Sequence, residues 1–161
     1  MEVKMRDTDF KKIVFICKDK KNNNYPLRYF YNPDVVFTLG NKKMVIIEHS
    51  STGDRKVHIG ELLQAYQYAV ESGNKCTFIL VLDGKNETSP TVDAERERLS
   101  FYYEFLKKLT NKDLMQVYVF DMKDIKKIMN NENVINCNKL KKLLGNYSAK
   151  LLLSNGASIE K

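Results

Sequence analysis

The chain has 161 residues, 43% of them hydrophobic, which is enough for one domain with a sizeable core. Lysine and arginine number 27 against 20 acidic residues, and the resulting formal charge of +7 favours polyanionic partners. No apolar run approaches the roughly 18 residues that a membrane-spanning helix needs, and the polar N-terminal segment does not resemble a signal peptide. We therefore expect a single cytoplasmic domain over residues 1–161 that has no membrane partner.

Several classes of site are disfavoured by the residues that such sites require. Cys17, Cys76 and Cys137 are far apart and lack C-x-x-C spacing, so they are predicted to be reduced thiols and neither disulfide partners nor zinc ligands. His49 and His58 are the two histidines, and nothing supplies the remaining ligands of a zinc site. Serine-hydrolase and nucleotide-binding chemistry are also disfavoured, because the chain has no Gly-x-Ser-x-Gly elbow and no Gly-rich phosphate loop.

The first third of the chain carries mixed helix and strand signals. Residues 9–18 fit a helix by the spacing of their apolar residues, but they include a run that is equally typical of a strand. Two β-prone runs, 34–39 and 43–50, predict strands on either side of a turn at Gly40-Asn41. A polar segment then leads into an amphipathic stretch, 57–71, that predicts a helix.

The rest of the chain alternates strand and helix signals. The nearly continuous apolar run at 76–82 is typical of a central strand that is covered on both faces. Further signals predict a second long helix at 93–109, a strand at 116–120, a short helix that ends at 129 and a weakly helical tail from 139. This order of elements predicts an α/β fold with a mixed central sheet of four or more strands flanked by helices.

Two acidic residues stand at the edges of the neighbouring strands predicted at 34–39 and 43–50. Asp34 opens the first of these strands, and Glu48 lies near the end of the second. If the strands pair across their turn, both carboxylates come to one end of the sheet. Burying an unpaired carboxylate is unfavourable by several kcal/mol, and a hard divalent metal held by oxygen ligands is a common solution. The pattern therefore predicts a metal site and raises the question of phosphodiester cleavage.

Residues 30–83 resemble the PD-(D/E)XK nuclease superfamily, which includes restriction endonucleases, RecB-type nucleases and Holliday-junction resolvases. Pro33-Asp34 matches the PD of the motif, and Glu48 matches its second acid at the end of the next strand. The following helix and apolar strand match the family's continuation. The resemblance implies a restriction-endonuclease-like fold in which Asp34, Glu48 and the backbone carbonyl of His49 bind Mg²⁺ or Mn²⁺.

The sequence departs from that family at the motif lysine, because Ser50 occupies the position two residues after Glu48. A serine hydroxyl cannot place a positive charge beside an attacking hydroxide. Lys56, at the start of the next helix, is the best local substitute, and Arg55 is the alternative as a fixed charge. The competing interpretation is that both residues belong to a solvated turn.

The helix at 57–71 adds a second motif. Gln64 and Tyr68 resemble the Gln-x-x-x-Tyr helix motif of RecB-type members, which implies that they support the metal site or contact DNA. The alternative is that they are ordinary residues on a solvated helix face. His58 at the start of the helix is a candidate phosphate contact. His49 is expected to point to the opposite face from Glu48 and to pack against the sheet.

Together these expectations describe an Mg²⁺-dependent DNA endonuclease of restriction type that acts as a homodimer, because one site cuts one strand and two-fold symmetry matches a palindrome. Basic residues gathered near both ends of the chain, with Tyr25, Tyr29, Phe30 and Tyr31 among them, are candidates for binding the DNA backbone and bases. Two alternatives remain open. One is a catalytically inactive DNA-binding or scaffold module, which Ser50 favours, and the other is a resolvase acting on branched DNA.

Overall fold

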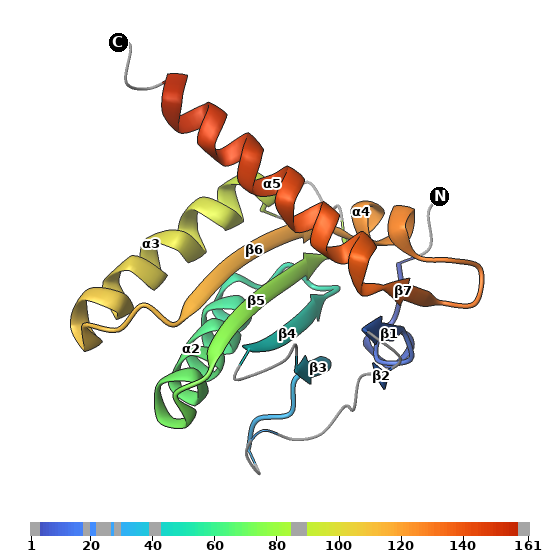
Figure 1. Ribbon diagram of the computed structural model, residues 1–161, viewed down its shortest axis with the longest axis horizontal. Coiled ribbons are helices and arrows are strands. Elements are labelled where there is room, and N and C mark those ends of the chain that lie inside the picture. The colour runs from blue at the N-terminus through green and yellow to red at the C-terminus, as the bar shows by residue number, and fades with distance from the viewer. Residues whose placement is uncertain are drawn as a thin grey trace.

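The computed structural model describes residues 4–17, 20–21, 27, 30–38, 43–84 and 90–157, with backbone only at 20–21 and 148–157. These residues form two sheets and five helices (Figure 1). The strands are β1 (Val14–Cys17), β2 (Lys20–Lys21), β3 (Val35–Thr38), β4 (Lys43–Ser50), β5 (Lys75–Leu82), β6 (Met115–Asp121) and β7 (Val134–Asn136). The helices are α1 (Asp7–Phe10), α2 (Arg55–Ser72), α3 (Val92–Thr110), α4 (Met122–Ile128) and α5 (Cys137–Ala157).

The larger sheet is mixed and has the strand order β3-β4-β5-β6. β3 and β4 are antiparallel, with Val35 opposite Ile47, whereas β4, β5 and β6 are parallel. Parallel neighbours need long crossovers, and α2 and α3 provide them. The smaller sheet has the order β2-β1-β7, in which β1 and β7 are parallel. The prediction of an α/β fold with a mixed sheet flanked by helices is therefore confirmed.

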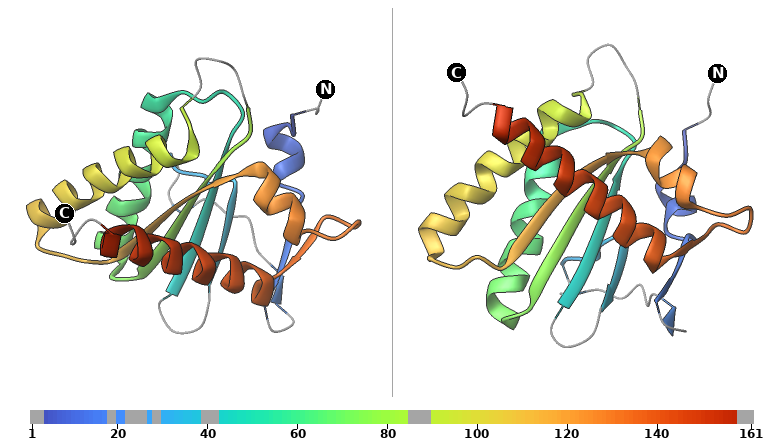
Figure 2. Two further views of the ribbon diagram at one scale, coloured as in Figure 1. Left: turned by 90° about the horizontal axis from the view of Figure 1, so that it is seen from above. Right: turned by 45° about the horizontal axis from the view of Figure 1, so that its top comes forward.

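Apolar side chains on the two faces of the larger sheet form two cores. Leu62 of α2 and Leu99 of α3 pack with Phe78 and Leu80 of β5 on one face. On the other face, α1, α4 and α5 join the small sheet around a second core. Figure 2 shows α2 and α3 on one side of the larger sheet and α5 on the other. β4 and β5 are buried along nearly their whole length, as expected for central strands covered on both faces.

Local signals set the limits of α2, the helix that borders the candidate site. The side chain of Asp54 caps its start by accepting a hydrogen bond from the backbone N–H of Lys56. Gly73 ends it in the left-handed conformation at φ 69°. The helix predicted over 57–71 is therefore present and begins two residues earlier, at Arg55.

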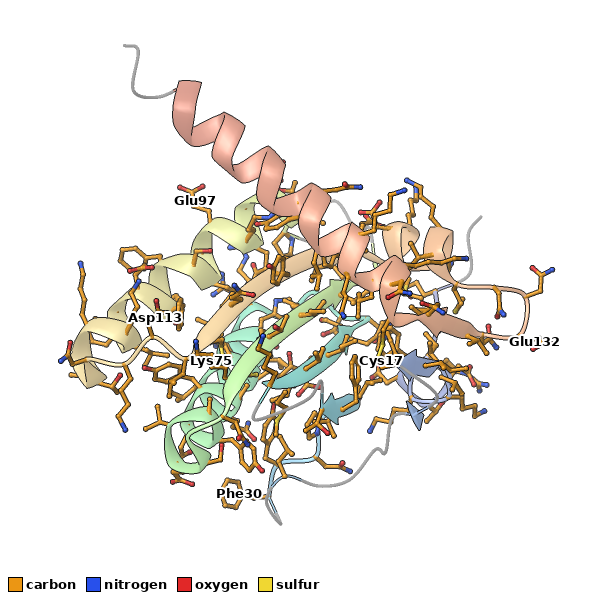
Figure 3. All side chains as sticks on the ribbon, viewed as in Figure 1. Cys17, Phe30, Lys75, Glu97, Asp113 and Glu132 are labelled. Atoms are coloured by element: carbon orange, nitrogen blue, oxygen red, sulfur yellow. A yellow bond between two sulfur atoms is a disulfide. The ribbon has the colours of Figure 1, made fainter. Side chains whose placement is uncertain are left out.

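The prediction that the cysteines are reduced thiols is wrong for two of the three. Cys17, at the end of β1, forms a disulfide with Cys137, the first residue of α5, across 120 residues of sequence (Figure 3). Their Cα atoms are 5.0 Å apart, within the usual range for a disulfide. The parallel pairing of β1 with β7 brings them together, and local spacing carries no sign of such a pairing. Cys76 is a buried free thiol whose pKa is raised to about 12 by burial.

Other expectations divide between confirmed and untested. Residues 9–18 contain the end of α1 and all of β1, so both the helix and the strand signals were real. The tail from 139 belongs to α5, which is longer than its weak pattern suggested. The turn at Gly40-Asn41 and the side chains of Tyr25 and Tyr29 lie outside the described residues. Among the helices described, none is long and apolar enough to cross a membrane.

Candidate functional site

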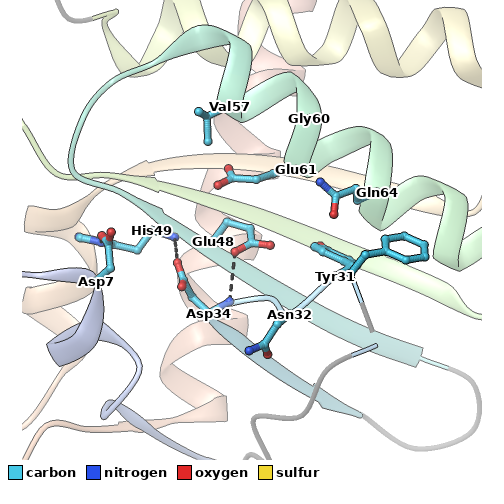
Figure 4. A pocket seen from close by; sticks show the side chains of 11 residues that line it. Asp7, Tyr31, Asn32, Asp34, Glu48, His49, Val57, Gly60, Glu61 and Gln64 are labelled. Atoms are coloured by element: carbon cyan, nitrogen blue, oxygen red, sulfur yellow. Dashed lines mark hydrogen bonds and ion pairs between the residues drawn. The ribbon is translucent and has the colours of Figure 1, made fainter. Parts of the chain in front are cut away.

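A pocket of about 480 Å³ lies beside the end of β4, between α1, the segment before β3 and α2 (Figure 4). Most of its lining side chains are polar or charged. The lining consists of Asp7, Phe30, Tyr31, Asn32, Asp34, Glu48, His49, Val57, Gly60, Glu61 and Gln64. Six residues predicted from the sequence for a metal or DNA site therefore meet in one cavity, namely Phe30, Tyr31, Asp34, Glu48, His49 and Gln64.

Asp34 and Glu48 are held next to each other by the β3–β4 pairing. Because Val35 is opposite Ile47, the residue before β3 lies beside Glu48. The backbone N–H of Asp34 donates to Oε2 of Glu48 at 3.1 Å, and the backbone N–H of His49 donates to Oδ2 of Asp34 at 2.8 Å (Figure 4). Main-chain donors thus fix the orientation of both carboxylates. Asp34 and Glu48 are close together at one end of the sheet, as the sequence predicted.

A third carboxylate, that of Glu61, reaches into the pocket from α2 (Figure 4). We call Asp34, Glu48 and Glu61 the acid cluster. Burial, reinforced by the charge of Asp34, raises the pKa of Glu48 to about 8. Burial, followed by the charges of Glu48 and Asp34, raises the pKa of Glu61 to about 9. Oε2 of Glu61 is buried and has no hydrogen-bond partner among the described residues.

One cation lies at the edge of the acid cluster. Nζ of Lys11, the residue that follows α1, is 3.4 Å from Oδ1 of Asp34. Burial raises the pKa of Asp34, although the hydrogen bond from His49 and the charge of Lys11 oppose the shift. Among the described residues, this one lysine does not balance three carboxylates that are half-buried or buried. The cluster therefore favours additional positive charge, or protons in its place.

The chemistry of the acid cluster suits a hard divalent cation. Mg²⁺ and Mn²⁺ prefer carboxylate and carbonyl oxygens, and such an ion would satisfy the unpaired Oε2 of Glu61. Within the part of the chain that the structure describes, no three His, Cys, Asp or Glu side chains form a group that could hold a metal ion as they stand. The carboxylate oxygens are thus the type of ligand that the predicted ion prefers. The described side chains would have to move closer together to coordinate it.

Ser50, which replaces the motif lysine, belongs to a different group of side chains. His58 Nε2 lies 2.7 Å from Oγ of Ser50, and His58 Nδ1 lies 2.9 Å from Oε1 of Glu95 on α3. Arg98 pairs with Glu95 and also donates to the backbone carbonyl of Arg55 at 2.8 Å. We call Ser50, His58, Glu95 and Arg98 the paired network. It joins the end of β4 to the starts of α2 and α3.

The paired network corrects the role predicted for His58. Its side chain is fully buried, so it cannot contact a phosphate from solvent, and the expectation of a phosphate contact is wrong. The burial depends on Glu95, which comes from a helix far along the chain. Ser50 is 6% exposed, and the backbone N–H of Gly53 also donates to its hydroxyl at 3.3 Å. Although the order serine–histidine–carboxylate occurs in hydrolases, here it is enclosed by packing.

His49 packs as predicted, on the face opposite Glu48. Its ring stacks on Phe10 with centroids 4.6 Å apart. Nδ1 lies 2.8 Å from Oδ1 of Asp7, and Nε2 lies 3.2 Å from Oδ2 of Asp83. The ring therefore anchors α1 and the end of β5 to β4. This contact also holds α1 against the pocket.

The substitute cations predicted from the sequence lie outside the pocket. Lys56 is exposed on the first turn of α2 and is not among the lining residues, so its placement does not support a role beside the acids. Arg55 meets the paired network through its backbone carbonyl and does not line the pocket either. Gln64 lines the pocket, whereas Tyr68, one turn later, packs at the margin of the α2–α3 core.

The sequence patterns gave no role to three charged residues at or beside the pocket: Asp7, Lys11 and Glu61. Glu61 is three residues before Gln64 and shares its side of α2, so its signal was present. Asp7 and Lys11 had no local signal, because their position depends on how α1 docks on β4. No family model, curated protein or solved structure matches this chain. The chemistry of the pocket is therefore the basis on which a function can be assigned.

Proposed function

We propose that this chain is a metal-dependent nuclease of the PD-(D/E)XK type that hydrolyses phosphodiester bonds in DNA. The observation that carries the proposal is the acid cluster, in which three carboxylates share one pocket and one buried oxygen has no described partner. Carboxylates with raised pKa values in a cleft are characteristic of functional sites. The mixed sheet and the positions of Asp34 and Glu48 at its end agree with the resemblance in sequence.

In this proposal, the carboxylates bind the metal ion and neighbouring residues position the carboxylates and the substrate. Asp34, Glu48 and the carbonyl of His49 would bind Mg²⁺ or Mn²⁺, with Glu61 as an additional carboxylate. When bound, the ion would polarise the scissile phosphate and lower the pKa of an attacking water. The N–H groups of His49 and Asp34 orient the two carboxylates before any ligand arrives, which reduces the reorganisation needed on binding. Gln64 would orient the DNA strand or a bound water.

Lys11 takes the place of the missing motif lysine in this proposal. Its ammonium group already contacts Asp34, next to the position where the scissile phosphate would sit. A lysine can move from a carboxylate to a phosphate because its side chain is long and flexible. Ser50 cannot serve this purpose, since its hydroxyl is bonded within the paired network. The net charge of +7 supports DNA as the substrate, through contacts to its backbone.

The test is cleavage of plasmid DNA with Mg²⁺ or Mn²⁺, together with calorimetric titration of Mn²⁺ into the protein without DNA. Asp34→Asn should abolish cleavage and metal binding, and Glu61→Gln should weaken both. Lys11→Met should lower the cleavage rate by about a hundredfold, as for loss of one preorganised charge. Lys12→Met is the matched control, because Lys12 is mostly exposed and pairs with Asp9 at 3.1 Å.

The outcomes separate the proposal from its rival. Wild-type protein that cleaves no linear, plasmid or branched DNA with either metal, and that binds no Mn²⁺, would overturn the proposal. DNA binding without cleavage would then favour the inactive DNA-binding module, which the replacement of the motif lysine by Ser50 supports. Cleavage confined to branched DNA would keep the chemistry and assign the substrate of a resolvase. If Lys12→Met loses as much activity as Lys11→Met, the role given to Lys11 is wrong.

A further inference from the structure

The outer face of α3 carries a row of apolar side chains that the fold leaves exposed. Phe101 is 71% exposed, Phe105 59% and Leu109 71%. Because they are four residues apart, they lie along one side of the helix, while Leu99 and Tyr103 face the core. Scattered exposed apolar residues are common on soluble proteins, but a continuous row on one helix marks an interaction surface. We call Phe101, Phe105 and Leu109 the apolar row.

Charges of opposite sign stand at the two ends of the apolar row. Glu97 is exposed near its start, and Figure 3 shows it projecting from α3 away from the larger sheet. Lys108 is exposed near its end. Neither forms an ion pair with another described residue, in contrast to Lys107, which pairs with Glu104 at 3.0 Å. The helix therefore presents an acid at one end of an apolar row and a base at the other, both available to a partner.

A second copy of α3 is the partner that this pattern fits. In an antiparallel pair of identical helices, a residue early in one helix lies beside a residue late in the other. A register that places Glu97 beside the partner's Lys108 also places Phe101 beside the partner's Phe105. Both contacts then occur twice, once on each side of the two-fold axis. One register thus satisfies the charges and buries the aromatic rings.

We propose that the chain forms a homodimer through antiparallel packing of α3 against α3 of a second copy. The surface is independent of the acid cluster and does not rest on the proposed nuclease function. α5 contacts α3 near the start of α3, where the guanidinium carbon of Arg96 lies 4.1 Å from the centre of the Tyr147 ring. The later part of α3 runs away from α5 (Figure 1). The two-fold axis lies across the middle of α3, between Phe101 and Phe105.

Sedimentation velocity of the full chain over a wide concentration range tests the proposal. Wild-type protein should form a concentration-dependent dimer, and Phe105→Glu should raise the dimer dissociation constant by at least about tenfold, as for loss of a central aromatic anchor. Its melting temperature should stay close to that of the wild type, because Phe105 is outside the core. A wild-type chain that is monomeric throughout, or a dimer that Phe105→Glu leaves intact, overturns the proposal.

Charge reversal tests the register of the pair. Glu97→Lys and Lys108→Glu should each weaken the dimer several-fold, and the double variant should recover most of the wild-type affinity, since the two charges are exchanged. Lys141→Glu, at an exposed lysine of α5, is the control. Alone it should leave the dimer unchanged, and in combination with Glu97→Lys it should not recover the affinity that Glu97→Lys loses. A double variant that is no tighter than either single variant overturns the antiparallel register.

Discussion

The acid cluster and the paired network stand at the same end of β4 but differ in how their charges are matched. In the paired network, burial favours a higher pKa for Glu95, but hydrogen bonds from Arg98 and His58 outweigh it and the pKa is lowered. In the acid cluster, burial and repulsion act in the same direction, and the pKa of Glu61 rises to about 9. The charges of the paired network are therefore matched without a ligand, whereas those of the acid cluster are not.

This difference distinguishes buried polar groups that stabilise the fold from buried polar groups that suit a binding site. Buried polar groups that are fully paired rigidify a core and specify its geometry. Carboxylates that are withdrawn from water without enough positive charge nearby are unfavourable, and such groups are typical of functional sites, where a cation can bind. The same strand, β4, carries Glu48 into the unmatched group and Ser50 into the matched one. Mutations in the two groups should therefore have opposite effects on stability.

The largest expected effect is in the paired network. Glu95→Ala removes the carboxylate that both Arg98 and His58 contact, and it leaves Nδ1 of the buried His58 ring without that partner. Breaking a buried pair in this way typically costs about 3–5 kcal/mol. Chemical denaturation should show a loss of that size in the free energy of unfolding. Glu132→Ala, at an exposed acid, is the control and should change it by less than about 0.5 kcal/mol. If Glu95→Ala and Glu132→Ala lose the same free energy of unfolding, the paired network does not stabilise the fold as described.

An intermediate effect is expected when the motif lysine is restored. Ser50→Lys inserts a longer, charged side chain beside the buried ring of His58, and overpacking of this kind typically costs about 1–3 kcal/mol. The free energy of unfolding should fall, and any cleavage activity should not increase. Ser50→Ala, which removes the hydroxyl without adding volume, should lose about 1 kcal/mol. A Ser50→Lys protein that is stable and more active would show that the strand position still accepts the lysine.

The smallest expected effect is a difference in the pH dependence of stability. In the absence of metal, folding raises the pKa of Glu48 to about 8 and of Glu61 to about 9 from ordinary values of 4.5. The folded state then holds protons that the unfolded state has released, so stability falls as the pH rises towards 9. The melting temperature of Glu61→Gln should fall less than that of the wild type between pH 6.5 and 9. If the melting temperatures of Glu61→Gln and the wild type fall equally with pH, the raised pKa assigned to Glu61 is wrong.

The paired network should give the opposite slope at acid pH. Burial lowers the pKa of His58 below its ordinary 6.5, so the folded state favours the neutral ring. Stability is therefore lost as the pH falls below about 6.5, where the unfolded state takes up a proton more readily. His58→Gln should flatten this acid limb while leaving the alkaline limb in place. Melting temperatures of Glu61→Gln and His58→Gln, measured across the pH range, report the alkaline and the acid loss of stability separately.

Local patterns were sufficient to predict the part of the fold that carries the acids. The strands β3 and β4 follow from β-prone runs, α2 from its apolar spacing and caps, and β5 from a continuous apolar run. The antiparallel pairing of β3 with β4 then places Asp34 beside Glu48. Contacts between distant segments were not predictable in this way. Lys11 reaches Asp34 because α1 docks on His49, and His58 is buried because α3 supplies Glu95. Both contacts depend on how helices pack against the sheet and against one another, which the spacing of apolar residues along the sequence does not predict.

The disulfide between Cys17 and Cys137 makes most of the chain a covalent ring. Every residue of the acid cluster and of the paired network lies within that ring, and such a cross-link stabilises the fold by about 5 kcal/mol in the chain-entropy model. A single cut by a protease anywhere between the two cysteines would leave the fragments joined. Limited proteolysis would therefore appear to spare the protein on a non-reducing gel. Only reduction before electrophoresis would reveal which surface loops had been cut.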